Sequence, residues 1–284
     1  MTTHAEHSKY ILVTGCSSGI GLCAALSLQK RGYKVIASVR NSNDVKTLQA
    51  LGLKHIVCLD LDSSTSIDSA VKEVLEICDG KLFALFNNAA FGQPGAVEDL
   101  SRDTLRANFE TNLFGTHELT IKLLPAMLKL PDARIIQNSS VLGLVAMPMR
   151  GAYNATKFAL EGLSDTMRLE LRNTNVRVIL IEPGPIKSLF RKNALEAFER
   201  NVDIGASRHR EKYEEVLGRL KKTGPASKFT LEPEAVVKKL SHALESRRPK
   251  NRYYVTTPTY IVGFLKRILS SGALDKFCLK AGDS

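Results

Sequence analysis

Short apolar runs alternate with longer segments of helical periodicity along most of the chain. Runs of about four to eight residues rich in Val, Ile and Leu are typical of buried strands. Seven such runs predict strands at residues 10–15, 34–39, 55–60, 82–88, 133–140, 176–184 and 252–257. The segments between them, with apolar residues three and four apart, predict helices at 20–32, 42–51, 102–129 and 152–172, and one that ends near residue 78.

This alternation predicts the α/β class, as a single-domain Rossmann fold with a doubly wound parallel sheet of about seven strands flanked by helices. No long polar linker and no internal repeat divides the sequence, so we expect one domain over residues 1–284. Ligands of such sheets bind outside the carboxyl ends of the strands, where the strand order reverses. Residues with candidate chemistry follow those ends: Gly15 to Gly21, Arg40, Asp60, Asn87, Asn88, Ser140, Pro183 and Gly184.

Two segments do not follow this alternation of strands and helices. Residues 187–230 are charged and have an irregular pattern, which predicts a lid over the site, with a surface excursion as the alternative. Residues 258–284 form a tail in which apolar residues are interrupted by Lys266 and Arg267, too short and charged to span a bilayer. We expect an amphipathic tail that contacts a membrane surface peripherally, packs over the substrate pocket or meets a second subunit; these alternatives stay open.

The net charge of +11 raises the question of a nucleic-acid partner. Residues 201–284 carry much of it, with 17 Lys and Arg against 9 Asp and Glu. These cations are scattered, and no aromatic platforms lie between them, so we expect no nucleic-acid partner. A solvated face, or attraction to an anionic cofactor or lipid, explains the charge better.

The composition also bears on compartment and metal binding. The first ten residues contain no apolar run, which argues against a signal peptide or a transit segment. The five cysteines form no CxxC pair, so we expect reduced thiols in a cytoplasmic protein. The six histidines are dispersed, and we expect no metal site.

The segment TGCSSGIG, residues 14–21, is a glycine-rich turn between a predicted strand and a predicted helix. Glycines at such a turn let the backbone approach a pyrophosphate, which the N-terminus of the helix attracts. The spacing is G-x-x-x-G-x-G, which differs from the G-x-G-x-x-G fingerprint of many dinucleotide-binding folds.

Five further motifs join this turn: NNAA at 87–90, Asn112 in ETNLFG, Ser140 in NSSVLG, YNATK at 153–157 and PGPI at 183–186. In this order and spacing the set resembles the short-chain dehydrogenase/reductase family, strongly over about residues 8–190 and loosely beyond. Bacterial NADP-dependent aldehyde reductases are the most similar members, with retinol and 17β-hydroxysteroid dehydrogenases as relatives. The resemblance implies an oxidoreductase that works as a homo-oligomer.

The resemblance also implies a catalytic set of Asn112, Ser140, Tyr153 and Lys157. Tyr153 would be the general acid in carbonyl reduction and the general base in alcohol oxidation. Lys157, four residues on and on the same helix face, would lower the tyrosine pKa together with oxidised nicotinamide, and would hold the nicotinamide ribose. Ser140 would polarise the substrate carbonyl, and Asn112 would position a water in the proton path.

Cofactor choice depends on the end of the second predicted strand, where Arg40 stands and no acidic residue does. A guanidinium suits the 2′-phosphate of NADP, so we expect NADP, with NAD less favoured and a solvated Arg40 as the alternative. The other positions implied to bind the cofactor are Gly15, Ser17, Ser18, Gly19, Ile20, Gly21, Asp60, Leu61, Asn88, Ala89, Tyr153, Lys157, Pro183, Gly184 and Ile186.

The hypothesis is an NADP-dependent reductase of aldehydes or hydrophobic ketones, working in either direction. Apolar residues expected near the mouth of the site favour an apolar substrate, although some of them can belong to the core: Leu142, Leu144, Val145, Met147, Met149 and Phe190. A retinol- or steroid-type alcohol dehydrogenase is the alternative within the class. A non-catalytic NADP-binding sensor or scaffold is the alternative outside it, and the intact Asn-Ser-Tyr-Lys set argues against that.

Overall fold

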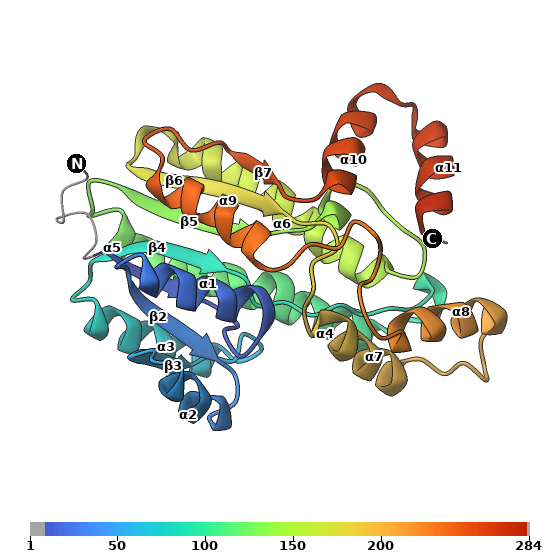
Figure 1. The fold of residues 1–284 in the computed structure, drawn as a ribbon, viewed down its shortest axis with the longest axis horizontal. Helices are drawn as coiled ribbons and strands as arrows, with labels where there is room; N and C mark the ends of the chain where they lie inside the picture. The colour runs from blue at the N-terminus through green and yellow to red at the C-terminus, as the bar shows by residue number, and fades with distance from the viewer. Residues whose placement is uncertain (1–8, 283–284) are drawn as a thin grey trace.

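One parallel sheet organises the molecule in the computed structural model, which describes residues 9–282 (Figure 1). The strand order is β3-β2-β1-β4-β5-β6-β7, and every neighbouring pair is parallel. The strands are β1 (Tyr10–Val13), β2 (Lys34–Val39), β3 (His55–Cys58), β4 (Leu82–Asn87), β5 (Ala133–Asn138), β6 (Val176–Glu182) and β7 (Arg252–Tyr254). The predicted seven-stranded, doubly wound α/β fold is confirmed.

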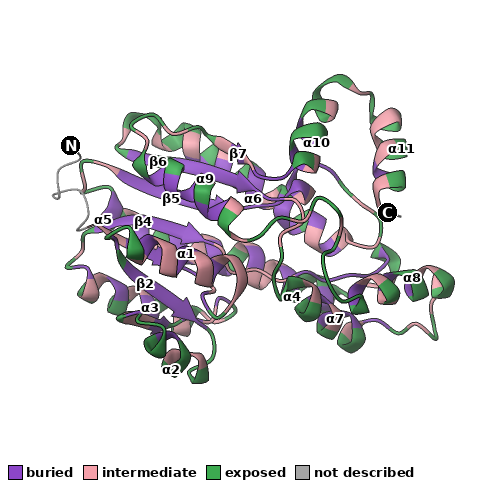
Figure 2. Ribbon diagram, viewed as in Figure 1, coloured by how far each residue is buried: buried purple, intermediate pink, exposed green. Residues whose placement is uncertain are grey.

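Helices cover both faces of this sheet, and the strands between them are buried (Figure 2). The chain-ordered helices are α1 (Gly19–Lys30), α2 (Asn43–Ala50), α3 (Ser64–Ile77), α4 (Arg102–Phe109), α5 (Thr116–Met127), α6 (Gly151–Glu170), α7 (Phe190–Asn201), α8 (Arg210–Lys221), α9 (Glu234–Glu245), α10 (Thr257–Ile268) and α11 (Ser271–Gly282). One apolar layer joins α1, α2 and α9 to the sheet. A second layer joins α3, α5 and α6 to its other face. Because both faces are covered, the strands are apolar throughout rather than alternating.

The strand order reverses between β1 and β4. From β1 the chain passes outward to β2 and β3, and then returns to β4 on the other side of β1. The loops that follow β1 and β4 therefore diverge to opposite faces and leave a crevice at their carboxyl ends. Thr14 and Gly15 follow β1 there, and Asn88 and Ala89 follow β4.

Two predicted elements differ from the structure. The single helix expected at 102–129 is interrupted by a π-helix at Glu110–Gly115 between α4 and α5. The irregular segment expected at 187–230 contains two full helices, α7 and α8. Their apolar faces pack together with the loop before α4, and buried Phe198, Tyr213 and Val216 are central to that cluster. Packing of these faces outweighs the high charge of the segment.

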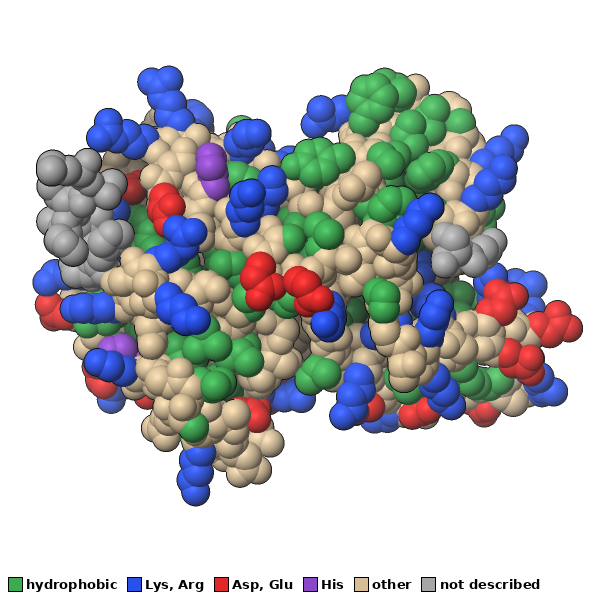
Figure 3. All heavy atoms as spheres, in the orientation of Figure 1, with side chains coloured by type: hydrophobic (Ala, Val, Ile, Leu, Met, Phe, Trp, Pro, Cys, Tyr) green, Lys and Arg blue, Asp and Glu red, His purple; other side chains and the backbone are tan. Residues whose placement is uncertain are grey.

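The C-terminal tail forms α10 and α11, which project beside the end of the sheet (Figure 1). α10 buries Val262 against residues 141–145, and Tyr260, Phe264 and Ile268 on its other side are exposed. Figure 3 shows an apolar patch over this helix with Lys and Arg side chains nearby. α10 thus has one buried apolar residue against the core and several exposed ones on its other side.

Within residues 9–282, no helix is long and apolar enough to cross a bilayer. The expectation about a signal or transit segment concerns mainly residues 1–8, which lie outside the described residues.

Candidate active site

The turn after β1 is shaped for close approach of a ligand to the backbone. Gly15 and Gly19 have φ angles of +70° and +55°, in the left-handed region that favours glycine. A Cβ on Gly21 would lie 2.1 Å from the carbonyl oxygen of Gly15, so this position accepts no side chain. Ser18, the N-cap of α1, makes no side-chain capping bond, and the first turn holds no acidic residue. The N-terminus of α1 is therefore open to a phosphate.

Hydrogen bonds join the ends of β1 and β4 beside this turn. The hydroxyl oxygen of Thr14 accepts from the backbone N–H groups of Asn88 and Ala89, at 2.9 and 3.0 Å. The Asn88 amide donates to the Thr14 carbonyl at 2.9 Å and accepts from the Asn138 amide, also at 2.9 Å. The motif residues of β1, β4 and β5 thus form one rigid edge. Thr14 and Asn138 were not among the predicted site residues, although Thr14 precedes Gly15 and Asn138 is two residues before Ser140.

The residues expected at the adenine end are spread over the ends of β2 and β3. Arg40 is exposed at the end of β2, and within the described chain it makes no ion pair. Asp60 is partly exposed after β3, and one of its carboxylate oxygens accepts from the backbone of Asp62. Leu61 is buried in the core, only 6% exposed, and its carbonyl oxygen would lie 1.9 Å from a Cβ at Gly115. Ser17 is exposed in the glycine turn, whereas Ile20 packs against the core.

α6 carries Tyr153 and Lys157 one turn apart near its N-terminus. Lys157 is 3% exposed, and its Nζ donates to the carbonyl oxygen of Asn138 at 2.8 Å. The same Nζ lies 5.6 Å from the centroid of the Tyr153 ring. Tyr153 keeps a partly exposed edge. The phenol and the ammonium are therefore neighbours in one pocket wall, as the predicted chemistry requires.

Burial sets the acidity of both groups. It raises the pKa of Tyr153 to about 12, against the smaller effect of a side-chain hydrogen bond with Ser140. It lowers the pKa of Lys157 to about 8, although the charge of Glu161 acts in the opposite direction. The sequence predicts a lowered tyrosine pKa when oxidised nicotinamide is also present. In the protein alone the phenol holds its proton firmly at neutral pH, which is the form that a proton donor needs.

Ser140 and Asn112 face the same region from two other elements. The Oγ of Ser140 accepts from the backbone N–H of Leu142 at 3.1 Å, so its own proton is directed elsewhere. Asn112 lies in the π-helix, where its amide donates to the Phe91 carbonyl at 2.9 Å and its oxygen accepts from the Phe91 N–H at 3.0 Å. It also donates to the hydroxyl of Thr156 at 3.2 Å. Widened π turns of this kind recur at functional sites.

A buried charge cluster supports α6 behind Lys157. Arg252 donates to Glu161, to Glu182 at 2.6 Å and to Asp165 at 2.7 Å. Glu161 lies four residues after Lys157 on α6, and Glu182 ends β6 without any exposure. Burial and the charge of Glu161 raise the pKa of Glu182, whereas Arg252 opposes the shift. Arg168 also pairs with Asp165, at 2.5 Å, so two guanidinium groups face three carboxylates and the cluster favours a bound proton.

The segment predicted as a lid reaches the tyrosine directly. The ring of Phe190, at the start of α7, meets the ring of Tyr153 edge-on, with centroids 5.2 Å apart. A Cβ on Gly92 would lie only 2.7 Å from Cζ of the same ring. On α8, the hydroxyl of Tyr213 accepts from the backbone N–H of Ala96 at 2.9 Å. α7 and α8 therefore close the outer side of the site against the loop after β4.

The turn after β6 completes the wall opposite the glycine turn. Pro183 accepts from the N–H of Val141 at 2.8 Å, and a Cβ on Gly184 would lie 2.1 Å from the hydroxyl of Thr256. Ile186 forms a bridge with Leu231. Ser188, three residues before Arg191, lies 3.0 Å from the Cβ position of Gly19. The open helix N-terminus, the crowded glycines and the strand-end crevice together fit a nicotinamide dinucleotide.

The apolar residues expected near the mouth divide into two groups. Leu144 and Val145 are buried in a cluster with α10 and α11, so they belong to the core. Leu142, Met147 and Met149 are only partly buried, and Phe190 is 38% exposed. The second group can contact a substrate.

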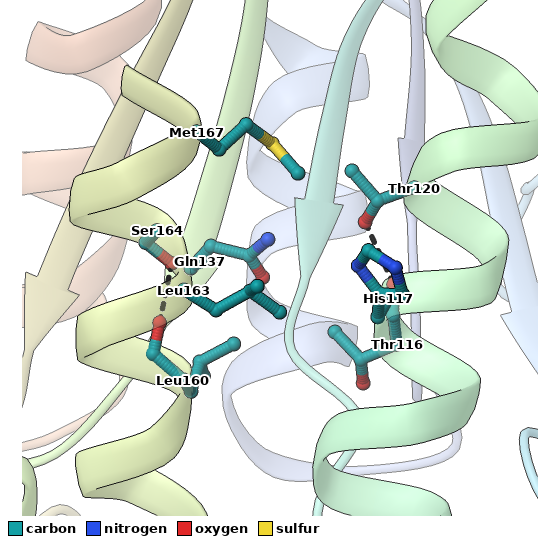
Figure 4. A pocket seen from close by; sticks show the side chains of 8 residues that line it. All are labelled: Thr116, His117, Thr120, Gln137, Leu160, Leu163, Ser164 and Met167. Atoms are coloured by element: carbon teal, nitrogen blue, oxygen red, sulfur yellow. Dashed lines mark hydrogen bonds between the residues drawn. The ribbon is translucent and has the colours of Figure 1, made fainter. Parts of the chain in front are cut away.

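A small cavity of about 10 Å³ lies between α5 and α6 (Figure 4). The Nδ1 of His117 and the Oε1 of Gln137 line it, and neither has a partner in the described chain. The space fits about one water molecule, which could bridge these two atoms. It is too small for a carbonyl substrate.

The cysteines are free; Cys16, Cys78 and Cys278 are buried, whereas Cys58 is exposed. Burial raises the pKa of the Cys16 thiol to about 12, which makes it unreactive.

The motif set and its geometry agree with a comparison of the sequence against protein families. The model described as short chain dehydrogenase matches residues 9–198. The chain belongs to the short-chain dehydrogenase/reductase family. It is therefore an oxidoreductase of this family, with a Rossmann-type sheet and the Tyr-Lys pair on α6.

Several members are similar over almost the whole chain. The uncharacterized oxidoreductase YbbO of Escherichia coli (strain K12) is 43% identical and covers 94% of this chain and 93% of its own. An NADPH-dependent 3-dehydrocapnine reductase of Ornithobacterium rhinotracheale is 31% identical, with 96% of each covered. Human retinol dehydrogenase 8 is also 31% identical, over 95% of this chain and 88% of its own. A solved short-chain dehydrogenase of Streptomyces avermitilis superposes with a TM-score of 0.75 at 28% identity, covering 92% of this chain and 93% of its own.

Proposed function

We propose that the chain is an NADPH-dependent reductase of aldehydes or hydrophobic ketones. The buried phenol of Tyr153 carries this proposal. Its pKa of about 12 keeps it protonated, Ser140 is hydrogen-bonded to it, and Lys157 lies beside it. A phenol that is protonated at neutral pH is the form that reduction of a carbonyl requires, because reduction consumes the proton.

The roles of the chain's own groups follow from their contacts. Ser140 would donate its hydroxyl proton to the substrate carbonyl oxygen, which can only accept, while its Oγ still accepts from Leu142. Tyr153 would transfer its proton to the same oxygen as negative charge develops there. Lys157, fixed by the Asn138 carbonyl, would stabilise the resulting phenolate. When bound, the reduced nicotinamide supplies the hydride that the carbonyl carbon accepts.

The choice of NADP over NAD is supported by two observations. Arg40 has its guanidinium free at the end of β2, the position at which a ribose 2′-phosphate is read in Rossmann folds. The 3-dehydrocapnine reductase relative is described as NADPH-dependent. The glycine turn, Asp60 and Leu61, Asn88 and Ala89, and the turn at 183–186 would hold the remainder of the cofactor.

A retinol- or steroid-type alcohol dehydrogenase is the second candidate. Similarity to human retinol dehydrogenase 8 favours it, as do the partly exposed apolar residues Leu142, Met147 and Phe190. The two candidates differ in substrate and in direction, but use the same residues.

The deciding experiment follows the loss of NADPH absorbance with a panel of medium-chain aldehydes, hydrophobic ketones, retinal and steroid ketones. Tyr153→Phe should lower kcat/KM by about 10²- to 10⁴-fold, the usual contribution of a proton donor. Tyr260→Phe, which changes an exposed tyrosine on α10, should leave it unchanged. Equal loss in both variants would contradict the role of Tyr153. Absence of turnover across the panel, together with tight NADPH binding, would indicate a sensor or scaffold instead.

The exposed apolar side of α10 suggests a partner for the tail. We propose that it meets either a second copy in a homo-oligomer or a membrane surface, and that the protein is cytoplasmic. Sedimentation with and without anionic vesicles distinguishes these two contacts.

A further inference from the structure

Three arginines surround the apolar cluster that α7 and α8 form outside the tyrosine. Arg150 is the N-cap of α6, Arg191 is the second residue of α7, and Arg219 is in the last turn of α8. Each sits beside residues of that cluster: Met149 precedes Arg150, and Leu220 follows Arg219. Each is only partly exposed. Three separate elements thus carry arginines that border one apolar cluster.

The three arginines lack the partners that buried cations normally have. No carboxylate lies within ion-pair distance of any of them among residues 9–282. Arg150 donates only to the thioether sulfur of Met147, at 3.0 Å, which is a weak acceptor. Arg191 donates to the Gly224 carbonyl, but its Nη1 is fully buried without an acceptor. A buried cation without a partner is costly, and it persists in a protein where a ligand completes it.

The mutual repulsion of these groups shows that they are close. Burial lowers the pKa of Arg150 to about 10, and the charge of Arg219 lowers it further. Burial likewise lowers the pKa of Arg219, with a contribution from Arg191. No acidic side chain opposes either shift. An anion placed among the three would relieve both the repulsion and the missing hydrogen bonds.

The cluster lies next to the reacting groups. Arg150, at the N-cap of α6, is three residues before Tyr153 in the sequence. Arg191 follows Phe190, whose ring contacts Tyr153. An anionic group held by the cluster is therefore within reach of a molecule whose carbonyl lies at the phenol.

We propose that Arg150, Arg191 and Arg219 bind the anionic group of the carbonyl substrate. This inference rests on the proposed reductase function and narrows its substrate class to apolar carbonyl compounds that also carry a carboxylate, sulfonate or phosphate. Planar guanidinium groups in an apolar setting suit such oxyanions, because each offers two parallel donors. The partly exposed apolar residues Met147, Met149 and Phe190 would contact the hydrocarbon part.

The pyrophosphate of the cofactor is the other anion that these arginines can bind. Gly19 belongs to the turn expected to hold the pyrophosphate, and Ser188, which lies against Gly19, is only three residues before Arg191. The two sources predict different kinetics. If the arginines bind the substrate, substituting them changes KM and kcat/KM for charged substrates alone. If they bind the cofactor, substituting them changes KM for NADPH with every substrate.

The test uses ω-oxo-carboxylic acids of graded chain length and their methyl esters, which differ only in the charge. Wild-type protein should turn over the best acid with a kcat/KM at least about tenfold above that of its ester. Arg219→Gln should reduce this ratio by about 10- to 100-fold, mainly through KM, and leave the ester unchanged. Arg219→Lys should restore part of it. Lys192→Gln, an exposed neighbour of Arg191 on α7, is the control for loss of one charge and should change neither substrate.

A second readout is independent of turnover. Adipate should raise the Tm of the wild-type protein and leave that of Arg219→Gln unchanged. In its absence, Arg219→Gln should melt at a higher temperature than the wild type, because like charges are removed.

Each other outcome is decisive. Equal kcat/KM for acids and esters, with no effect of Arg219→Gln, would overturn the anion site and leave the reductase function intact. A raised KM for NADPH with every substrate would assign the arginines to the cofactor and overturn the proposal. If neither acids nor esters react, the reductase function fails, and an adipate-dependent Tm shift lost in Arg219→Gln would still support the site, whereas no shift would overturn it.

Discussion

Phe190 packs edge-on against Tyr153, with 5.2 Å between the ring centroids, although the two residues belong to different helices. This contact joins the segment over the site to the proton donor. It implies that the segment shapes the pocket in which the carbonyl is held, and that the order of the phenol depends on α7.

Phe190→Ala should therefore raise KM for apolar carbonyl substrates by about tenfold, because an aromatic contact and some apolar burial are lost. The Tm should change little, since Phe190 is 38% exposed. Steady-state kinetics and thermal unfolding measure these two effects. Leu189→Ala, at a neighbouring position that is 50% exposed, is the control, and an equal effect there would argue against a specific contact.

The pH profile of reduction should report Lys157. Its pKa of about 8 means that the ammonium is present at pH 7 and lost above pH 8. Because the ammonium stabilises the phenolate left after proton transfer, kcat/KM for reduction should be level below pH 8 and fall above it. In Lys157→Met the rate should be lower and this inflection absent. An unchanged inflection in the variant would assign it to another group.

Alanine substitutions at two helix glycines, Gly21 in the glycine turn and Gly162 on α6, should have opposite effects on stability. Gly21→Ala places a Cβ 2.1 Å from the Gly15 carbonyl oxygen and should destabilise the fold by about 3 kcal/mol or more, with loss of NADPH binding. Gly162→Ala, on α6, meets no atom within 4 Å and should stabilise it by up to about 1 kcal/mol. Urea unfolding and a cofactor titration measure both. Similar behaviour of the two variants would show that the turn is not tightly packed.

Arg40 should distinguish the two cofactors. Arg40→Asp replaces a phosphate-binding cation with an anion, so KM for NADPH should rise by about 100-fold while KM for NADH changes little. Lys46→Asp, an exposed residue on α2, makes the same charge change away from the strand end and should have little effect. Equal increases for both cofactors in Arg40→Asp would show that Arg40 does not read the 2′-phosphate.

Much of this arrangement could be predicted because its signals are local. Each strand is one apolar run, and each family motif lies within a few residues of a strand end. The charge cluster under Lys157 could not be predicted, since Arg252 is 91 residues from Glu161 in sequence. The π-helix ends at Gly115, which lies close to the Leu61 carbonyl, and such an approach between distant segments leaves no local signal. α8 did have a local signal, in the spacing of Tyr213, Val216 and Leu220, but its many charges concealed it.

The carboxylate cluster behind the site predicts a dependence of stability on pH. Burial and the charge of Glu161 raise the pKa of Glu182 from 4.5 to about 8 in the folded protein. The folded state therefore binds the proton more tightly than the unfolded state, and the stability this provides is complete below about pH 4.5 and is lost as the pH rises to about 8.

Glu182→Gln should abolish the loss of folding stability at high pH, because the amide keeps the shape of the protonated acid and carries no charge. Arg252 would still bind Glu161 and Asp165. We expect the free energy of unfolding of the variant to exceed that of the wild type at pH 8.5, and the difference to shrink toward pH 5. Glu245→Gln, which changes an exposed carboxylate paired with Arg31, should give no such trend. A constant difference between Glu182→Gln and wild type over this range would mean that Glu182 stays ionised when folded, with Arg252 neutralising it in preference to its neighbours.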